Sequence, residues 1–114
     1  MDAQTVLIVE DEDAIRLTLR DYLEDLGYQV LVASDGVGAI KQILDSRVDI
    51  VVSDYRMEPL GGDYWVRFLQ RFCPQTPVLM TSGFLKPEIR MPFDVIHKPF
   101  NYAEISERMR ALLQ

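Results

Sequence analysis

Five short apolar runs divide the sequence, and they constrain the fold more than any other feature of the chain. Each run has four or five residues, is rich in Val, Ile and Leu, and is nearly continuous rather than alternating with polar residues. Continuous apolar runs of this length are typical of parallel strands that are buried on both faces of a sheet. We therefore predict strands at Val6–Val9, Gln29–Ala33, Ile50–Ser53, Val78–Thr81 and Asp94–His97.

Longer amphipathic segments separate these runs and predict helices, because their apolar residues recur at three- and four-residue spacing. The first helix is predicted from Asp13 to Leu26, with Gly27 as its C-terminal stop. The last follows Asn101, which can cap it together with Glu104 three residues on. The four apolar stripes are Ile15, Leu19, Tyr22, Leu23 and Leu26; Val37, Ile40, Ile43 and Leu44; Trp65, Leu69 and Phe72; and Ile105, Met109 and Leu112.

The segment 83–92, between the fourth and fifth runs, has room for only a turn or two of helix between its prolines. Strands that alternate with helices are typical of an open α/β sheet with right-handed crossovers. We predict one α/β domain over residues 1–114, a flavodoxin-like, doubly wound (βα)5 three-layer sandwich with parallel sheet order 2-1-3-4-5 and a shortened fourth helix. In that order a crevice opens at the carboxyl ends of strands 1 and 3, where ligands bind.

The charge balance limits the partners of the chain. Its 114 residues carry a formal net charge of −6, and phosphate backbones require a basic surface, so we expect no direct binding of nucleic acid. No apolar run approaches the roughly 20 residues that cross a bilayer, and the acidic N-terminal segment lacks the basic start of a signal peptide. The single Cys73 has no partner for an intramolecular disulfide. These features predict a cytoplasmic domain that does not enter a membrane.

Polar side chains follow the predicted strands. Glu10 and Asp11 follow the first strand, Asp54 the third, Ser82 the fourth and Lys98 the fifth. Because the carboxyl ends of parallel strands meet at one edge of a sheet, we expect these groups to share one small pocket. Neighbouring carboxylates repel unless cations compensate, and Lys98 supplies one positive charge, so the sequence predicts a divalent cation as well. Oxygen ligands in small number favour Mg²⁺.

This set of groups suits the transfer of a phosphoryl group to a carboxylate. An aspartate can attack phosphorus and form an acyl phosphate, while a metal, a lysine and a hydroxyl stabilise the charge on the remaining oxygens. Asp54, Lys98 and Ser82 fill these roles beside the metal. Two simpler alternatives stay open: the acids from Glu10 to Asp13 as a solvated helix start, and Ser82 as an ordinary turn serine.

Four segments, in order and over essentially the whole chain, resemble the receiver domain of two-component response regulators: VLIVEDEDAIR, VVSDYRMEPLGG, PVLMTSG and HKPF. The resemblance implies that Asp54 is the phosphoacceptor. It also implies that Asp11 binds Mg²⁺ directly, Glu10 through water, and the backbone carbonyl of Arg56 as a further ligand, with Mn²⁺ able to substitute. The bond between Lys98 and the following proline is implied to be cis.

The same resemblance implies the partners. The donor is a phosphohistidine on a sensor histidine kinase or phosphotransfer protein, or a small-molecule phosphodonor. Phosphorylation then switches the conformation of the domain, with dimerisation or a fused or separate output protein as the readout. The chain is expected to be a signalling phosphoacceptor rather than an enzyme, although it promotes its own phosphorylation and dephosphorylation.

Several positions depart from the family pattern. Val95 stands three residues before the lysine, where the family often has an aromatic residue that moves inward on phosphorylation. We therefore expect the usual coupling between the hydroxyl residue and this aromatic residue to be absent or rerouted. Arg56 and Phe84 occupy positions that tune dephosphorylation in the family, and the bulk of Phe84 predicts a long-lived phosphoryl group. Glu58 stands where the family usually has proline, with Pro59 one place on.

Two other function classes compete with the switch. A degenerate receiver that acts as a constitutive protein-interaction module is favoured by Val95 and the short fourth connection, and opposed by the complete set of acids, hydroxyl and lysine. An enzyme that binds nucleotide or flavin is disfavoured because the chain has no GxxxxGK[ST] or GxGxxG loop. We interpret His97 as a structural or surface residue on the face opposite to Lys98, rather than a member of the pocket. Tyr64, Trp65 and Phe68 are interpreted as packing residues rather than a partner site.

Overall fold

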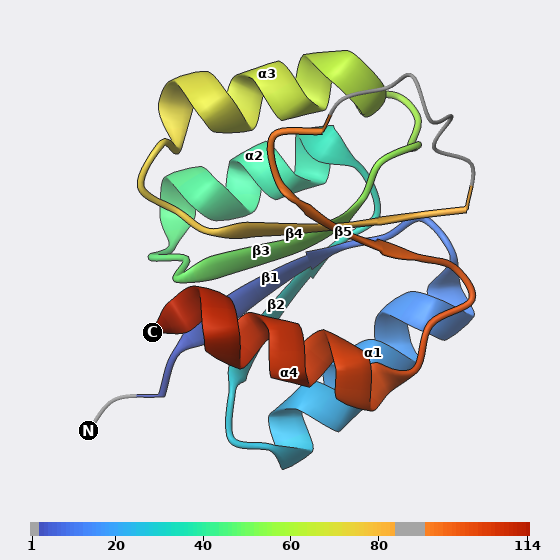
Figure 1. Cartoon of the computed structure of the whole chain (residues 1–114). Helices are drawn as coiled ribbons and strands as arrows, with labels where there is room; N and C mark the ends of the chain where they lie inside the picture. Colours follow the sequence, from blue (N-terminus) through green and yellow to red (C-terminus); the bar gives the residue numbers. More distant parts are fainter. Residues whose placement is uncertain (1–2, 84–90) are drawn as a thin grey trace.

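A computed structural model of the chain describes residues 3–83 and 91–114 (Figure 1). Its centre is a sheet of five parallel strands in the order β2-β1-β3-β4-β5. The strands are β1 (Thr5–Val9), β2 (Gln29–Ala33), β3 (Ile50–Asp54), β4 (Val78–Ser82) and β5 (Asp94–His97). The predicted strand order is confirmed, and each predicted strand agrees with the observed one to within a residue at either end.

Four helices lie within the described residues: α1 (Asp13–Asp25), α2 (Gly36–Asp45), α3 (Gly62–Phe72) and α4 (Tyr102–Leu113). Figure 1 shows α2 and α3 on one face of the sheet and α1 and α4 on the other, which confirms the three-layer sandwich. The predicted short fourth helix falls on the segment 83–92, of which 84–90 lie outside the described residues. No helix in 3–83 or 91–114 has both the length and the apolar character that crossing a bilayer requires.

Two apolar clusters, one on each face of the sheet, form the core. On one face Trp65 and Leu69 of α3 pack with side chains of β1, β3 and β4. On the other face Leu23 of α1 and Ile105 and Met109 of α4 pack with the opposite side chains of the same strands. Every residue of β3 and β4 is buried, whereas the edge strands β2 and β5 are only partly buried. Helices on both faces therefore explain why the central strands are continuous apolar runs.

The ends of the helices follow the signals in the sequence. Asn101 caps α4, because its Oδ1 accepts a hydrogen bond of 3.1 Å from the backbone N–H of Glu104. Asp35 caps α2 in the same way, through Gly38 at 3.0 Å. Gly27, predicted as the stop of the first helix, has a φ of +99°, which glycine adopts at little cost.

The predicted burial was wrong for four members of the apolar stripes. Leu26, Val37, Leu44 and Phe72 were assigned to inward stripes, but they are 54%, 43%, 78% and 64% exposed. Each lies at an end of its helix or beyond the arc that faces the sheet, so helical spacing alone overestimated the width of the buried stripe.

Candidate functional site

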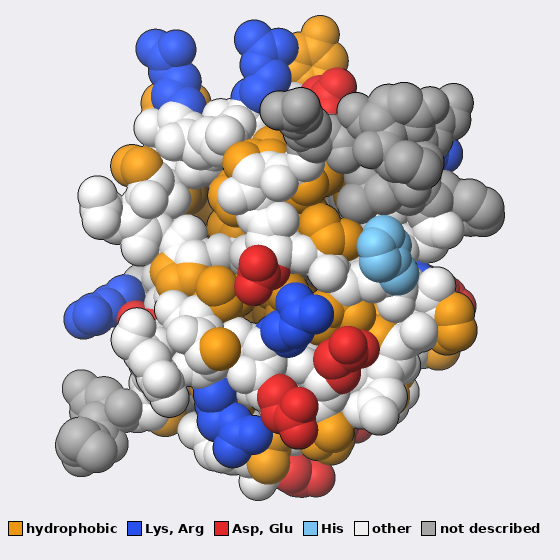
Figure 2. Space-filling view, in the orientation of Figure 1, with side chains coloured by type: hydrophobic (Ala, Val, Ile, Leu, Met, Phe, Trp, Pro, Cys, Tyr) orange, Lys and Arg blue, Asp and Glu red, His pale blue; other side chains and the backbone are white. Residues whose placement is uncertain are grey.

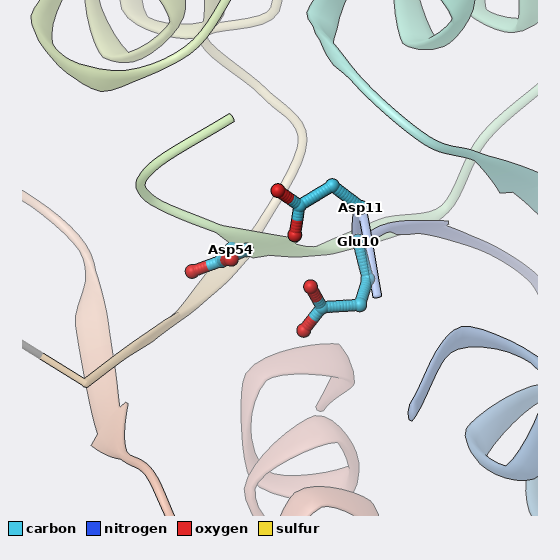
Figure 3. Close-up of side chains that lie close together, drawn as sticks. All are labelled: Glu10, Asp11 and Asp54. Atoms are coloured by element: carbon cyan, nitrogen blue, oxygen red, sulfur yellow. The ribbon is translucent and has the colours of Figure 1, made fainter. Parts of the chain in front are cut away.

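Three carboxylates meet at the carboxyl edge of the sheet (Figure 3). Glu10 and Asp11 follow β1, and Asp54 is the last residue of β3. The strands pair Val9 with Ser53, so the residues that follow them lie side by side. One oxygen of each carboxylate lies within 4.8 Å of the other two. Glu10 and Asp54 are 3% and 8% exposed, while Asp11 is open to solvent.

Lys98 reaches the same cluster from the end of β5. Its Nζ donates a hydrogen bond of 2.6 Å to Glu10 Oε1 and one of 3.3 Å to Asp54 Oδ2. Its backbone N–H donates to the carbonyl of Ser82 at 2.9 Å, which holds the segment after β5 against the end of β4. The peptide bond between Lys98 and Pro99 is cis, as the family resemblance implied. We refer to Glu10, Asp11, Asp54 and Lys98 as the acidic edge.

The environment of the acidic edge changes its protonation. Burial raises the pKa of Glu10 from 4.5 to about 7; the hydrogen bond from Lys98 opposes this shift, and the charge of Asp54 adds to it. Burial lowers the pKa of Lys98, but the hydrogen bond to Glu10 and the charge of Asp54 outweigh burial, and the pKa is raised. Lys98 therefore stays charged, and its single ammonium contacts two of the three clustered carboxylates, those of Glu10 and Asp54.

The donor set fits a hard divalent cation. The clustered ligand atoms are carboxylate oxygens, which Mg²⁺ prefers over softer donors. A hollow of about 410 Å³ opens beside Asp11 and leaves room for water or a phosphoryl group. The hollow is lined by Asp11, Arg56, Met57, Glu58, Gly61 and Gly62.

Two glycines fold the loop after β3 back towards the acidic edge. Gly62 has a φ of +58°, and its N–H donates to the carbonyl of Tyr55 at 2.6 Å. A Cβ at Gly61 would lie 2.6 Å from the backbone N and O of Met57, so a larger residue would displace the loop. Arg56 is exposed in this loop and lines the hollow, which places its backbone within the segment that borders the cluster.

The remaining residues predicted from the sequence lie at different places in the structure. Ser82 is the last residue of β4, 2% exposed, at the same edge of the sheet as Asp54. Val95 is half-buried in β5 and packs against the apolar cluster beneath α2 and α3. His97, interpreted as a structural or surface residue, is exposed. Phe84 lies outside the described residues.

Arg16 is a residue of the site that sequence reasoning missed. Its Nη1 donates to the backbone carbonyl of Glu10 at 2.9 Å, and its Nη2 forms an ion pair of 2.6 Å with Asp13. The guanidinium thereby fixes the backbone where β1 passes into α1. In the sequence, this role was indicated only by the position of Arg16, one turn into a predicted helix that begins with acidic residues.

Ser53 and Trp65 form a second contact that the sequence did not reveal. The buried Nε1–H of Trp65 donates to Ser53 Oγ at 2.9 Å, and the Ser53 hydroxyl donates to the backbone carbonyl of Asp54 at 2.8 Å. Both side chains are fully buried. This pair ties the end of β3, and with it Asp54, to α3.

Comparison with known proteins decides the family. The family model described as the response regulator receiver domain matches residues 6–110. The chain belongs to this family. This receiver is 36% identical over 115 residues to the response regulator MprA of Mycobacterium sp. (strain KMS), and 33% identical over 118 residues to the sensor kinase CckA of Brucella abortus (strain 2308).

Solved structures agree with the assignment. The receiver superposes on the chemotaxis response regulator CheY4 of Vibrio cholerae with a TM-score of 0.87 and 28% sequence identity, covering 97% of this chain and 99% of that one. The sequence alignments each cover 96% of this chain, but only 50% of MprA and 12% of CckA. The receiver thus corresponds to part of each of these longer relatives.

Proposed function

We propose that this receiver accepts a phosphoryl group on Asp54 in a reaction that requires Mg²⁺, and that it thereby acts as a switch in a two-component phosphorelay. The position of the Asp54 carboxylate carries this proposal. It is 8% exposed at the end of β3, within 3.3 Å of Lys98 Nζ and beside the carboxylates of Glu10 and Asp11.

Asp54 is the nucleophile in this proposal. One of its carboxylate oxygens forms a bond to phosphorus while the bond from phosphorus to the donor imidazole nitrogen breaks. The electron pair stays on that nitrogen, which takes up a proton. Lys98 contacts Asp54 Oδ2 and is positioned to bind an oxygen of the new acyl phosphate. Ser82, at the end of the adjacent strand, is assigned to a second phosphoryl oxygen.

We assign Mg²⁺ to Asp11 and Asp54, to Glu10 through water, and to the backbone carbonyl of Arg56, with Mn²⁺ as a substitute. A bound Mg²⁺ supplies positive charge that compensates the carboxylates and the oxygens of the phosphoryl group. The clustering of three carboxylates beside one ammonium supports this assignment, because carboxylates this close together repel one another unless cations compensate them.

The donor we propose is a phosphohistidine on a sensor histidine kinase or a phosphotransfer protein, in the cytoplasm. The receiver then regulates a fused or separate output protein or dimerises. Val95 supports an output route that differs from the usual one, because a half-buried valine has no ring to exchange between two positions. The bulk of Phe84 still predicts a long-lived phosphoryl group, and Phe84→Ala should shorten its half-life.

Acyl-phosphate labelling tests the proposal. The chain is incubated with acetyl phosphate and either Mg²⁺ or EDTA, and intact mass spectrometry counts the phosphoryl groups. We expect one group with Mg²⁺, none with EDTA, and none in Asp54→Ala. Asp25→Ala is the matched control, because Asp25 is an exposed carboxylate at the far end of α1 that lies outside the cluster.

Two outcomes would contradict the proposal. Labelling that persists in Asp54→Ala would place the phosphoryl group elsewhere. A properly folded wild-type chain that takes up no group with Mg²⁺ would favour the alternative of a constitutive interaction module.

A further inference from the structure

The side of α3 that faces away from the sheet carries an unusual concentration of exposed aromatic rings. Tyr64 and Phe72 are 73% and 64% exposed, and they are two of the three most exposed large apolar side chains in the described part of the chain. With Arg67, Phe68 and Arg71 they form a surface that we call the α3 outer face. A hollow of about 660 Å³ lies along it. Single exposed apolar residues are ordinary, but a contiguous set marks a candidate interaction surface.

Two rings of the α3 outer face, those of Phe68 and Phe72, are supported from below by the buried Trp65. Phe68 stacks on Trp65 with ring centroids 5.7 Å apart and planes 9° apart, and Phe72 lies 5.1 Å from Phe68. Trp65 is fully buried and hydrogen-bonded to Ser53. Rings that are already fixed lose little conformational freedom when a partner covers them, which favours binding.

Two arginines lie beside these rings. The guanidinium of Arg67 lies 5.9 Å from the centre of the Tyr64 ring, and that of Arg71 lies 5.6 Å from the centre of the Phe72 ring. Stacking on a ring leaves the N–H groups at the edge of the guanidinium directed outward. Figure 2 shows the basic side chains at the top of the molecule, over α3.

These arginines differ from four others in the chain. Arg16, Arg20, Arg47 and Arg108 each form an ion pair with a carboxylate. Within residues 3–83 and 91–114, Arg67 and Arg71 form none. The one acid of α3, Asp63, accepts a hydrogen bond from the Tyr55 hydroxyl at 2.5 Å and is thereby engaged with the preceding loop. The α3 outer face is therefore locally basic, although the whole chain has a net charge of −6.

The spacing of the side chains indicates the shape of a matching partner. Tyr64, Phe68 and Phe72 recur at every fourth residue, as do Arg67 and Arg71, so the rings and the guanidinium groups form two adjacent rows along one helix. A second helix that carries an apolar row and a row of acids at the same spacing complements both rows. Nucleic acid also binds arginines and aromatic rings, but the strongly acidic remainder of the chain repels a phosphate backbone.

We infer that the α3 outer face is a docking surface for an acidic amphipathic helix of a partner protein. The apolar row of that helix contacts Phe68 and Phe72, and its carboxylates pair with Arg67 and Arg71. This surface is separate from the acidic edge, and its existence does not depend on the chemistry proposed for Asp54.

Two synthetic helical peptides test this inference. The first has a row of Leu and a parallel row of Glu at four-residue spacing, and the second has Lys in place of every Glu. The uniformly ¹⁵N-labelled full chain is titrated with each peptide and followed by amide chemical shifts. We expect saturable shifts that centre on residues 64–72 with the Glu peptide, and none there with the Lys peptide.

Charge-reversal variants sharpen the test. Arg67→Glu and Arg71→Glu should each weaken binding of the Glu peptide by about tenfold. Arg47→Glu makes the same change of charge at a side chain that is 91% exposed and outside α3, so it should change the affinity little. Tyr64→Ser and Phe72→Ser should also weaken binding, and thermal melting of every variant confirms that it is folded.

Several outcomes would overturn the inference. These are the lack of any saturable shift at millimolar Glu peptide, equal binding of both peptides, and an equal effect of Arg47→Glu and Arg67→Glu. Tighter binding of a single-stranded oligonucleotide to the same residues would assign the surface to nucleic acid instead. Self-association in sedimentation velocity that Arg67→Glu abolishes would assign it to a second copy of the chain.

Discussion

The acidic edge and the α3 outer face both carry charge, but they are built in opposite ways. At the acidic edge the charged groups are largely buried and contact one another, with Lys98 Nζ at 2.6 Å from Glu10 and 3.3 Å from Asp54. On the α3 outer face the arginines lie over exposed rings and pair with no acid in the described part of the chain. Charges that contact one another set each other's reactivity, whereas unpaired charges are available to a second molecule. This difference is the reason that we propose chemistry at the acidic edge and binding of a partner at the α3 outer face.

Trp65 connects the two regions. Its indole N–H holds Ser53, which in turn donates to the carbonyl of Asp54, and its ring supports Phe68 on the α3 outer face. One fully buried side chain therefore positions a strand end on one side and an aromatic row on the other.

Trp65→Ala should therefore damage both regions and have the largest effect. Removing a fully buried indole leaves a cavity, and we expect the free energy of unfolding to fall by about 3–5 kcal/mol. Urea denaturation followed by circular dichroism measures this loss. Trp65→Phe, which keeps a ring but loses the hydrogen bond to Ser53, should fall between this variant and wild type. Equal stability of the Ala variant and wild type would mean that the two regions are not joined through this residue.

Lys98→Ala should impair the acidic edge and leave the α3 outer face unchanged. Removing the ammonium leaves Asp54 without its hydrogen bond from Lys98 and removes the donor that we propose for a phosphoryl oxygen, so the rate of acyl-phosphate labelling should fall by about 10²–10³-fold. Time-resolved mass spectrometry with acetyl phosphate and Mg²⁺ gives the rate. Lys41→Ala, at an exposed lysine of α2, is the control and should label like wild type. A rate for Lys98→Ala close to that of the control would remove Lys98 from the proposed mechanism.

Most residues of the acidic edge could be predicted from the sequence, for a physical reason. A central strand buried on both faces leaves a continuous apolar run, so the end of the run fixes which residue comes next. Asp54 and Ser82 proved to be the last residues of their strands rather than the first after them, a shift of one position. Because parallel strands present their carboxyl ends at one edge, the convergence of Glu10, Asp54 and Lys98 followed from the strand order.

The exposed residues of the α3 outer face could not be predicted from the sequence in the same way. The spacing of apolar residues placed Phe72 with Trp65 and Leu69, yet Phe72 is 64% exposed while the other two are buried. Burial on a helix depends on the angle at which it packs and on its neighbours, and neither is encoded in local periodicity. The contact of Arg16 with the Glu10 carbonyl was missed for a similar reason, because a side chain that bonds to backbone leaves no mark in the pattern of residue types.

The pH dependence of stability should also distinguish the two regions. Between pH 4.5 and about 7 the folded chain keeps a proton on Glu10 that the unfolded chain has released. The native state then binds more protons, so without metal the free energy of unfolding should rise as the pH falls through this window, by on the order of 3 kcal/mol. Urea titrations in EDTA from about pH 8 to about pH 5 measure it.

Two further measurements, on a Glu10 variant and with added Mg²⁺, test whether the pH dependence of stability arises at the acidic edge. Glu10→Gln should flatten the curve, because the titrating group is gone. Mg²⁺ should stabilise the chain most at the alkaline end, where Glu10 is ionised and free to bind it. Stability that instead rises with pH in EDTA would show that other groups dominate, and Arg67→Glu should leave the slope unchanged in either case.

Phe72→Ser should have the smallest effect on the chain itself. Phe72 is 64% exposed at the end of α3, so we expect the free energy of unfolding to change by no more than about 0.5 kcal/mol and the labelling rate of Asp54 to stay at the wild-type value. Urea denaturation and acetyl phosphate labelling give both quantities, with Trp65→Ala on the same helix as the contrasting variant. A loss above about 1 kcal/mol would mean that Phe72 contributes to the packing of the chain. The Phe72 ring would then contribute to the stability of the fold. In that case its exposure could not be taken as evidence that it is reserved for a partner.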